Sequence, residues 1–308
     1  MKTTFSLPLR FAQNGARRIP MGLIVAAAIF LQHNATAVEV DLGTANNFAV
    51  LAYSAVSSTG PTVITGGNVG LYPDTLSSVT GFSPGNGTVT APGIIEAANF
   101  DTQQAQNDLT TAYKTAAGLA PTKDLSGQDL GGLTLTPGVY SFSSSAGLTG
   151  KLTLNNQGNP DAVFVFKIGS TLTTASGSSV VTINDGPLSG SHPGISVFWQ
   201  VGSSAVLGTG TDFEGNILAQ ASITDNSGST VLGRLLAETG AVTLNDTTIT
   251  APPAEVNGGG GGKNVPDTGS TLLLLGFGVA ALSAFKALSS AWQRSGRLIA
   301  GGPAHPAI

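Results

Sequence analysis

The sequence predicts a mostly β protein: a right-handed β-solenoid of triangular cross-section, with one long α-helix packed along one side. Three observations predict this fold. Only 10% of the 308 residues are charged and 42 are Gly, a composition typical of all-β proteins with many tight turns. Short apolar runs recur between Gly residues with a spacing near eighteen. One segment has instead the spacing of an amphipathic helix.

The N-terminal residues 1–37 are predicted to be a secretory signal peptide. Lys2, Arg10, Arg17 and Arg18 precede an apolar run over 21–31, and the small-x-small sequence Ala35-Thr36-Ala37 then offers a cleavage site. The apolar run is too short to span roughly 30 Å of hydrocarbon as a membrane helix. The mature chain would begin near Val38, and its predicted solenoid domain extends over 38–256.

The apolar runs form the first predicted side of the solenoid. Residues 216–220 and 234–238 are similar, and each run follows a Gly, which predicts about three strands per coil. Related runs lie at 48–52, 163–167 and 197–200. Because these strands are apolar on both faces, a second element must cover the face that points away from the core.

A helix over about 93–117 is expected to provide that cover. Small or apolar side chains recur there at alternating steps of three and four, which places them on one helix face. They are Ile95, Ala98, Thr102, Ala105, Leu109, Ala112 and Ala116. Pro92 suits the first turn, and Gly118 with Pro121 suits the end. We therefore expect the helix to lie along the apolar side as a lid.

The second predicted side follows the apolar runs and carries the candidate binding residues. Alternate residues of a strand point in opposite directions, so Val56, Leu172, Ile223 and Val242 are expected to point inward. The outward set is Ala55, Ser57, Thr171, Thr173, Ser204, Ser222, Thr224, Ala241 and Thr243, with the register around Ser204 left open. This surface is small, rich in Thr and almost free of charge.

The third predicted side also carries Thr, but acidic residues interrupt it. Its Thr residues are Thr209, Thr211, Thr230, Thr247, Thr248 and Thr250. Asp212, Glu214 and Asp246 lie among them. The sequence does not decide between the second and third sides as a binding face.

Beyond the domain, a Gly-rich linker (257–264) leads into a predicted sorting tail (265–308). The tail contains Val265-Pro266-Asp267-Thr268-Gly269, an apolar transmembrane segment over 271–285, and the basic residues Lys286, Arg294 and Arg297. It resembles the VPDSG-type sorting tails of some Gram-negative bacteria, and less closely the LPxTG sortase signal, in which Leu stands at the position of Val265. A plain C-terminal membrane anchor is the alternative. Either reading predicts a secreted protein that is extracellular or anchored at the cell surface.

From Val40 to Thr250 the chain resembles the microbial ice-binding (antifreeze) proteins with a discontinuous β-solenoid. Residues 41–52, 135–140, 162–166 and 233–244 carry the resemblance, in the family's order. It implies a triangular solenoid with a flanking helix, and ice binding through one flat side next to the helix-covered one. The expected partners are the ice surface, the export and sorting machinery, and the membrane through the C-terminal segment, and the domain is expected to be monomeric.

The expected function is therefore to adsorb to ice and inhibit its growth and recrystallisation, or to attach cells to ice. The alternative is a surface adhesin or matrix protein that binds cells or a polysaccharide. Such a protein would be expected to carry aromatic or charged clusters, which the second side lacks.

An enzyme is not expected, and neither is a cofactor or metal. Residues 81–85 match the G-x-S-x-G motif by letter, but Pro84 has no N–H to offer an oxyanion. His192 is the one His of the predicted domain, and no Cys is present. The carboxylates Asp212, Glu214, Asp225 and Glu238 are dispersed, unlike those of a carbohydrate-cleaving enzyme. The formal net charge of −4 argues against nucleic acid.

Overall fold

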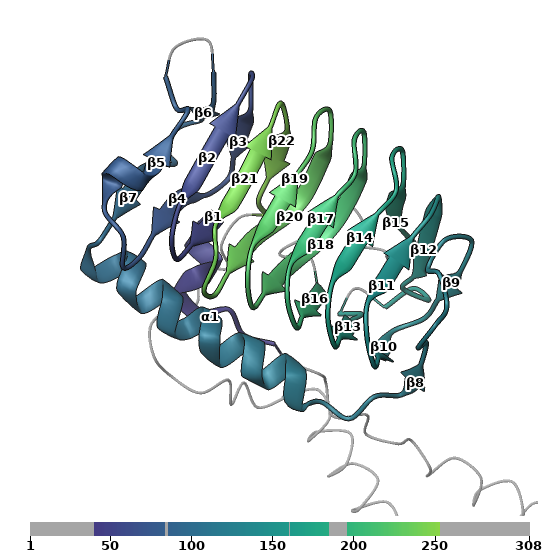
Figure 1. Ribbon diagram of the computed structural model, residues 1–308. Helices are drawn as coiled ribbons and strands as arrows, with labels where there is room; N and C mark the ends of the chain where they lie inside the picture. The colour runs from purple at the N-terminus through teal and green to yellow at the C-terminus, as the bar shows by residue number, and fades with distance from the viewer. Residues whose placement is uncertain (1–39, 84–85, 160, 185–195, 253–308) are drawn as a thin grey trace, which may run out of the picture. The chain divides into compact units, whose positions relative to one another are not determined.

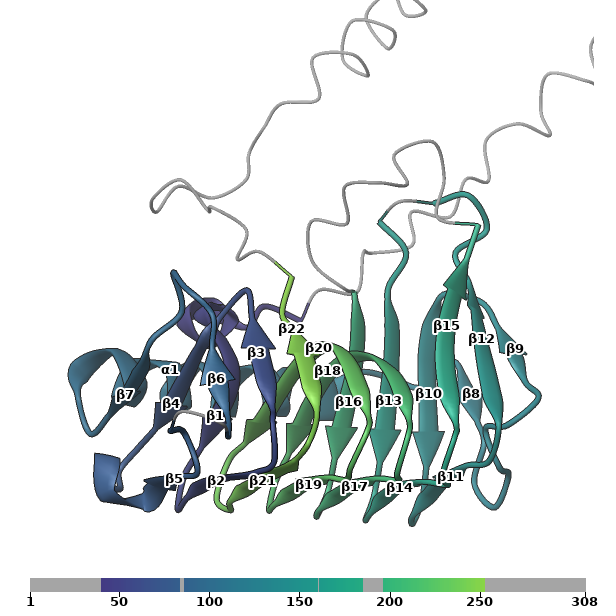
Figure 2. The same ribbon diagram turned by 90° about the horizontal axis from the view of Figure 1, so that it is seen from above.

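The computed structural model describes residues 40–83, 86–159, 161–184 and 196–252, which all belong to one compact unit of the chain. The predicted signal peptide, linker, sorting tail and His192 lie outside these residues. Within them the protein is mostly β, with one α-helix and two sheets of parallel strands. Figures 1 and 2 show the strands stacked coil upon coil, with the helix running along one side.

The larger sheet has fifteen strands and the smaller has seven. The larger contains β1 (Phe48–Ala52), β3 (Val63–Thr65), β4 (Asn68–Leu71), β6 (Thr88–Val89), β7 (Ile95–Ala97), β8 (Lys123–Asp124), β9 (Thr134–Leu135), β10 (Gly138–Phe142), β12 (Lys151–Asn155), β13 (Phe164–Ile168), β15 (Ser179–Ile183), β16 (Val197–Val201), β18 (Asp212–Ala219), β20 (Thr230–Ala237) and β22 (Thr248–Thr250). The smaller contains β2 (Val56–Thr59), β5 (Val79–Thr80), β11 (Ala146–Leu148), β14 (Leu172–Thr174), β17 (Ala205–Leu207), β19 (Ile223–Asp225) and β21 (Val242–Asn245). Two short 3₁₀ helices are η2 (Gly43–Asn47) and η3 (Leu76–Ser78).

The coils do not stack in chain order, and the first coil lies beside the last. In the smaller sheet the order is β11-β14-β17-β19-β21-β2-β5, so β2 pairs with β21 across a separation of 186 residues. The larger sheet has the same junction, where β1 pairs with β20 and β3 pairs with β22. We call this junction the seam.

Arg234 links the two ends of the chain at the seam. Its side chain is almost fully buried, and its Nη2 donates to the carbonyl oxygen of Asn46 at 2.9 Å and to that of Pro252 at 2.7 Å. Its Nη1 donates to Oδ1 of Asn216 at 3.2 Å. Burial lowers the pKa of Arg234 to about 10. One buried guanidinium therefore holds the segment before β1 and the segment after β22 together.

Glycine at two corners lets β18 and β20 pass from one side of the stack to the next. Gly215 and Gly233 have φ of +124° and +152°, a conformation that side chains rarely adopt. A Cβ added at Gly233 would lie 2.0 Å from the carbonyl oxygen of Gly215, and one at Gly215 would lie 2.5 Å from Nε1 of Trp199. These positions explain why each repeated apolar run follows a Gly.

The interior of the stack holds the main apolar core. Val56, Leu172, Ile223 and Val242 are fully buried in it, as predicted. Tyr140, Phe166 and Trp199 lie on neighbouring coils, with ring centroids 5.5 and 4.0 Å apart. This stacking adds to the burial of the rings themselves.

The helix α1 (Phe100–Gly118) covers the outer face of the first side, which confirms the expected lid. A second apolar cluster joins Ala105, Leu109, Ala112 and Ala116 of the helix to outward side chains of the strands. Those strand residues are Phe48, Leu51, Val139, Val165, Phe198, Leu218 and Leu236. The apolar runs are thus covered on both faces.

The predicted start of the helix at 93 is wrong. Asn99 is the N-cap, because its side chain accepts from the backbone N–H of Thr102 at 2.8 Å in a capping box. The preceding Ile95–Ala97 forms β7, which pairs with β4, so neither Ile95 nor Ala98 lies on the helix face and Pro92 is not in its first turn. Among the described residues no helix is long and apolar enough to cross a membrane.

Buried hydroxyl groups line the inside of the corner between the smaller sheet and the third side. Thr62, Ser178, Thr211, Ser229 and Thr247 recur there on successive coils. Asp225 is fully buried beside them and accepts a hydrogen bond from the hydroxyl of Ser229. Burial raises the pKa of Asp225 from 3.8 to about 6, although the nearby hydroxyl groups of Ser229 and Thr247 oppose the rise.

We predict that Gly233→Ala will destabilise the domain by more than about 3 kcal/mol or prevent its folding, because the new methyl group meets the backbone of Gly215. Gly210→Ala is the matched control: Gly210 has φ of +66° with no atom near an added Cβ, so only the left-handed conformation would cost, about 1–2 kcal/mol. Urea unfolding followed by circular dichroism measures both. Equal losses would contradict the corner contact.

The raised pKa of Asp225 predicts lower stability at neutral than at mildly acidic pH. The folded chain holds this proton up to about pH 6 and the unfolded chain releases it near 3.8, so stability falls as pH rises between these values. From pH 4.5 to 7.5 the loss from this group should reach about 2 kcal/mol. Asp225→Asn should remove that part of the pH dependence in thermal unfolding. An unchanged pH profile in this variant would contradict the assignment.

Candidate functional site

The outward side chains of the smaller sheet form two rows in register, which together we call the threonine face. In the first row each residue pairs with the next across the sheet. The order is Gly147, Thr173, Val206, Thr224, Thr243, Ser57 and Thr80. The second row lies two residues earlier along the chain. It consists of Thr171, Ser204, Ser222, Ala241 and Ala55, whose carbonyl oxygens accept backbone hydrogen bonds from the neighbouring coils.

The structure brings all nine residues of the predicted outward set together on this face. Ala205 is fully buried, which settles the open register so that Ser204 points outward. Thr173 and Thr243 are exposed, and the other seven are partly exposed.

Sequence reasoning missed three residues of the first row, Gly147, Val206 and Thr80. Val206 and Gly147 each lie between two buried apolar residues of their strands. This alternation of inward and outward positions is visible in the sequence and could have identified both residues. Thr80 lies in β5, which has no recognisable repeat, so only the pairing of Ser57 with Thr80 reveals it. The face is therefore longer than the sequence predicts.

Within the seven strands neither row of the threonine face has an ionisable side chain, and the first row ends where Gly147 bridges to the exposed Asp129. The one acidic residue of these strands, Asp225, points inward and is buried. Adjacent strands lie about 4.8 Å apart, so the seven strands present a repeat that is roughly 29 Å long. At the seam the hydroxyl of Ser57 lies 3.4 Å from that of Thr243, so the rows continue without a gap.

Two of the six Thr residues that the sequence places on the third side do not face outward. Thr211 and Thr247 point inward and are buried, because they belong to the hydroxyl groups of the corner rather than to a strand face. Thr211 lies 2.8 Å from the hydroxyl of Thr174. Thr230, Thr248 and Thr250 do point outward, and the exposed Thr209 lies in a turn.

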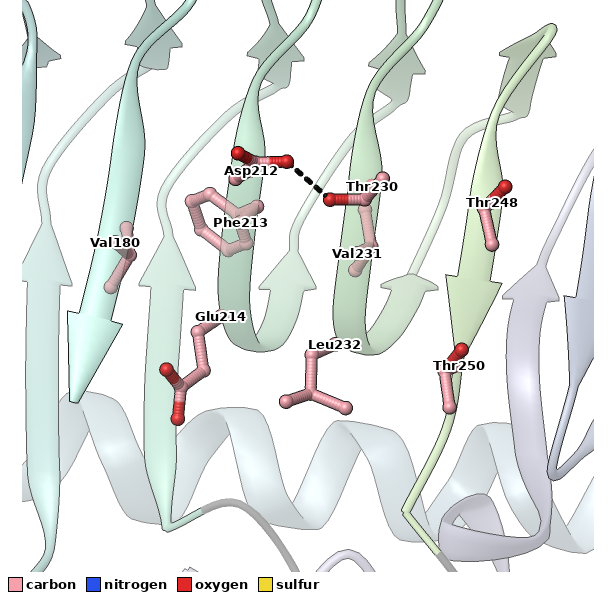
Figure 3. A pocket seen from close by; sticks show the side chains of 9 residues that line it. All are labelled: Val180, Asp212, Phe213, Glu214, Thr230, Val231, Leu232, Thr248 and Thr250. Atoms are coloured by element: carbon pink, nitrogen blue, oxygen red, sulfur yellow. Dashed lines mark hydrogen bonds between the residues drawn. The ribbon is translucent and has the colours of Figure 1, made fainter.

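Two carboxylates border a groove of about 260 Å³ on the third side (Figure 3). Asp212 accepts from the hydroxyl of Thr230 at 2.6 Å. Glu214 accepts from the backbone N–H and the hydroxyl of Thr182 at 3.2 and 3.1 Å. These contacts fix both carboxylates to neighbouring strands.

The remaining carboxylates lie elsewhere, as the sequence indicated. Asp225 is inside the stack, and Glu238 lies beside Thr110 and Lys114 of the helix. Burial raises the pKa of Glu238. The hydrogen bond from Thr110 and the positive charge of Lys114 act in the opposite direction and lower this pKa. In the part of the chain that the structure describes, no three His, Cys, Asp or Glu residues are grouped so that they could hold a metal ion.

Comparison with known sequences finds two family matches. A model described as ice-binding-like matches residues 50–250, and a VPDSG-CTERM motif matches 264–288. An ice-binding protein of Nostoc sp. (strain HG1) is 49% identical over 274 residues, which cover 86% of this chain and 94% of that protein. An ice-binding protein of Colwellia sp. is 35% identical and covers 69% of this chain and 84% of that protein.

The solved structures that resemble this chain are also ice-binding proteins. The crystal structure of an ice-binding protein from an Antarctic biological consortium has a TM-score of 0.62 at 42% identity, and covers 68% of this chain and 90% of that one. An ice-binding protein from the Antarctic ascomycete Antarctomyces psychrotrophicus has a TM-score of 0.62 at 38% identity, and covers 70% of this chain and 99% of that one.

Proposed function

Because the chain belongs to the ice-binding-like family, we propose that it is an ice-binding protein and that the threonine face is the surface that contacts ice. The observation that supports this face is its charge-free pair of rows in register over seven parallel strands. We also infer that the stack is a right-handed solenoid of triangular cross-section.

The physical basis is an ordered layer of water on a rigid surface. Thr offers a methyl group and a hydroxyl on a stiff β-branched stem, and the parallel ladder repeats it at the strand spacing. Charged groups, which bind water strongly in orientations of their own, are excluded from the rows. Because the face is fixed by backbone hydrogen bonds on every strand, little conformational entropy is lost when it docks.

The surroundings of the domain set its biological role. The VPDSG-CTERM match supports export and retention at the cell surface, with the apolar segment 271–285 acting as the membrane anchor until sorting. At the surface a monomeric domain would inhibit the growth and recrystallisation of ice, or attach the cell to ice. The family match gives no support to the alternative of an adhesin for cells or polysaccharides, or to an enzyme.

We predict that Thr224→Tyr will weaken ice binding and leave the fold intact. Thr224 lies in the middle of the first row between Val206 and Thr243, so a ring there would hold both neighbours away from the ice. The concentration needed to inhibit recrystallisation should rise by roughly tenfold or more, a loss of about 1.4 kcal/mol.

The matched control is Thr115→Tyr, which adds the same ring to an exposed position of the helix. It should inhibit recrystallisation and shape ice crystals as the unchanged chain does. If Thr224→Tyr also retains full activity, the threonine face is not the ice-contacting surface. If the unchanged chain does neither, the proposed function is wrong.

A further inference from the structure

The third side carries a second array of Thr and aliphatic residues in register, in addition to the threonine face. It spans β6, β3, β22 and β20, and we call it the third-side array. One column runs Thr88, Val63, Thr248 and Thr230 across paired strands. The other runs Thr90, Thr65, Thr250 and Leu232. Six of these eight residues are Thr, and none is charged.

The array is exposed although it contains two large aliphatic side chains. Leu232 is 44% exposed and Val63 is 38% exposed, while the alternate residues Ile64, Val231 and Ile249 are buried in the core. Figure 3 shows Leu232 near Thr250, on the outer surface of the strands. The array therefore resembles the threonine face in composition, because in the first row of that face the aliphatic Val206 also lies between two Thr residues.

The array has a definite end. On the next strand, β18, the two columns continue as Asp212 and Glu214. The hydroxyl of Thr230 is already bound to Asp212. The charge-free area is therefore four strands wide, or about 14 Å at the ordinary strand spacing, and its Thr230, Leu232, Thr248 and Thr250 line the groove that the two carboxylates border.

The array is continuous with the threonine face because the same coils form both. β2 leads into β3, β19 into β20, and β21 into β22. The buried hydroxyl groups of Thr62, Ser229 and Thr247 lie inside the turns between them. Backbone hydrogen bonds connect these turns. The N–H of Thr248 donates to the carbonyl oxygen of Ser229 at 3.0 Å, and the N–H of Val63 donates to the carbonyl oxygen of Thr247 at 2.8 Å. The two surfaces thus meet at a rigid edge.

We propose that the third-side array is a second ice-contacting surface, so that the domain meets ice through two faces that share an edge. This inference rests on the proposed function. Ice fits the array better than a protein or polysaccharide does, because the array lacks the aromatic and Arg side chains on which protein interfaces depend. A domain with two such faces binds more crystal planes than a domain with one.

Fluorescence from a single-crystal ice hemisphere, grown in the presence of labelled full-length chain, identifies the planes bound. The variants are Thr224→Tyr on the threonine face, Thr250→Tyr on the third-side array, and the double variant. Thr115→Tyr is the control for labelling and for the added ring. Leu232→Lys provides a second disruption of the array at an exposed position that tolerates a polar side chain.

We expect each single variant to lose a different subset of the planes that the unchanged chain stains, and the double variant to lose all of them. Leu232→Lys should lose the same subset as Thr250→Tyr. If Thr224→Tyr alone abolishes all staining and both array variants stain like the unchanged chain, the array does not contact ice but the proposed function stands. If the unchanged chain stains no plane, both fail.

Discussion

The pairing of the first coil with the last is the constraint on which the rest of the structure depends. β1, β2 and β3 complete the stack only by pairing with β20, β21 and β22, which the chain forms almost two hundred residues later. Arg234 joins both chain segments at this seam, through the carbonyl oxygens of Asn46 and Pro252. Without the seam the threonine face would be divided into a five-stranded and a two-stranded piece.

The helix makes that arrangement possible. After β7 the chain stands at one end of the stack, and it must reach the other end before it can build coils back toward the seam (Figure 1). The 19 residues of α1 span about 28 Å at the rise of an α-helix, which is most of the roughly 38 Å that eight spacings between the strands from β7 to β8 cover. The helix therefore carries the chain along the stack and covers the apolar outer face of the strands it passes.

Much of this could be predicted from the sequence, because local alternation determines which side chains point inward. The apolar runs after Gly215 and Gly233, and the outward set from Ala55 to Thr243, follow from it. The inward direction of Thr211 and Thr247 cannot be predicted in this way, because they lie at a corner, where the alternation of a strand is interrupted. The predicted helix start is wrong because Ile95–Ala97 fits a helix face locally but pairs with the strand β4. The seam leaves no local signal, since it joins residues distant in sequence.

The most direct test of the seam uses the pair Ser57→Cys and Thr243→Cys, which are register partners in a chain with no other cysteine. Neighbouring strand positions fall within the Cα separation that a disulfide accepts. We expect the oxidised full-length chain to form this bridge within one molecule and to unfold at a higher temperature than the reduced chain. If no intramolecular bridge forms, or if closing it lowers the unfolding temperature, the first and last coils do not lie side by side and the threonine face is not continuous across the seam.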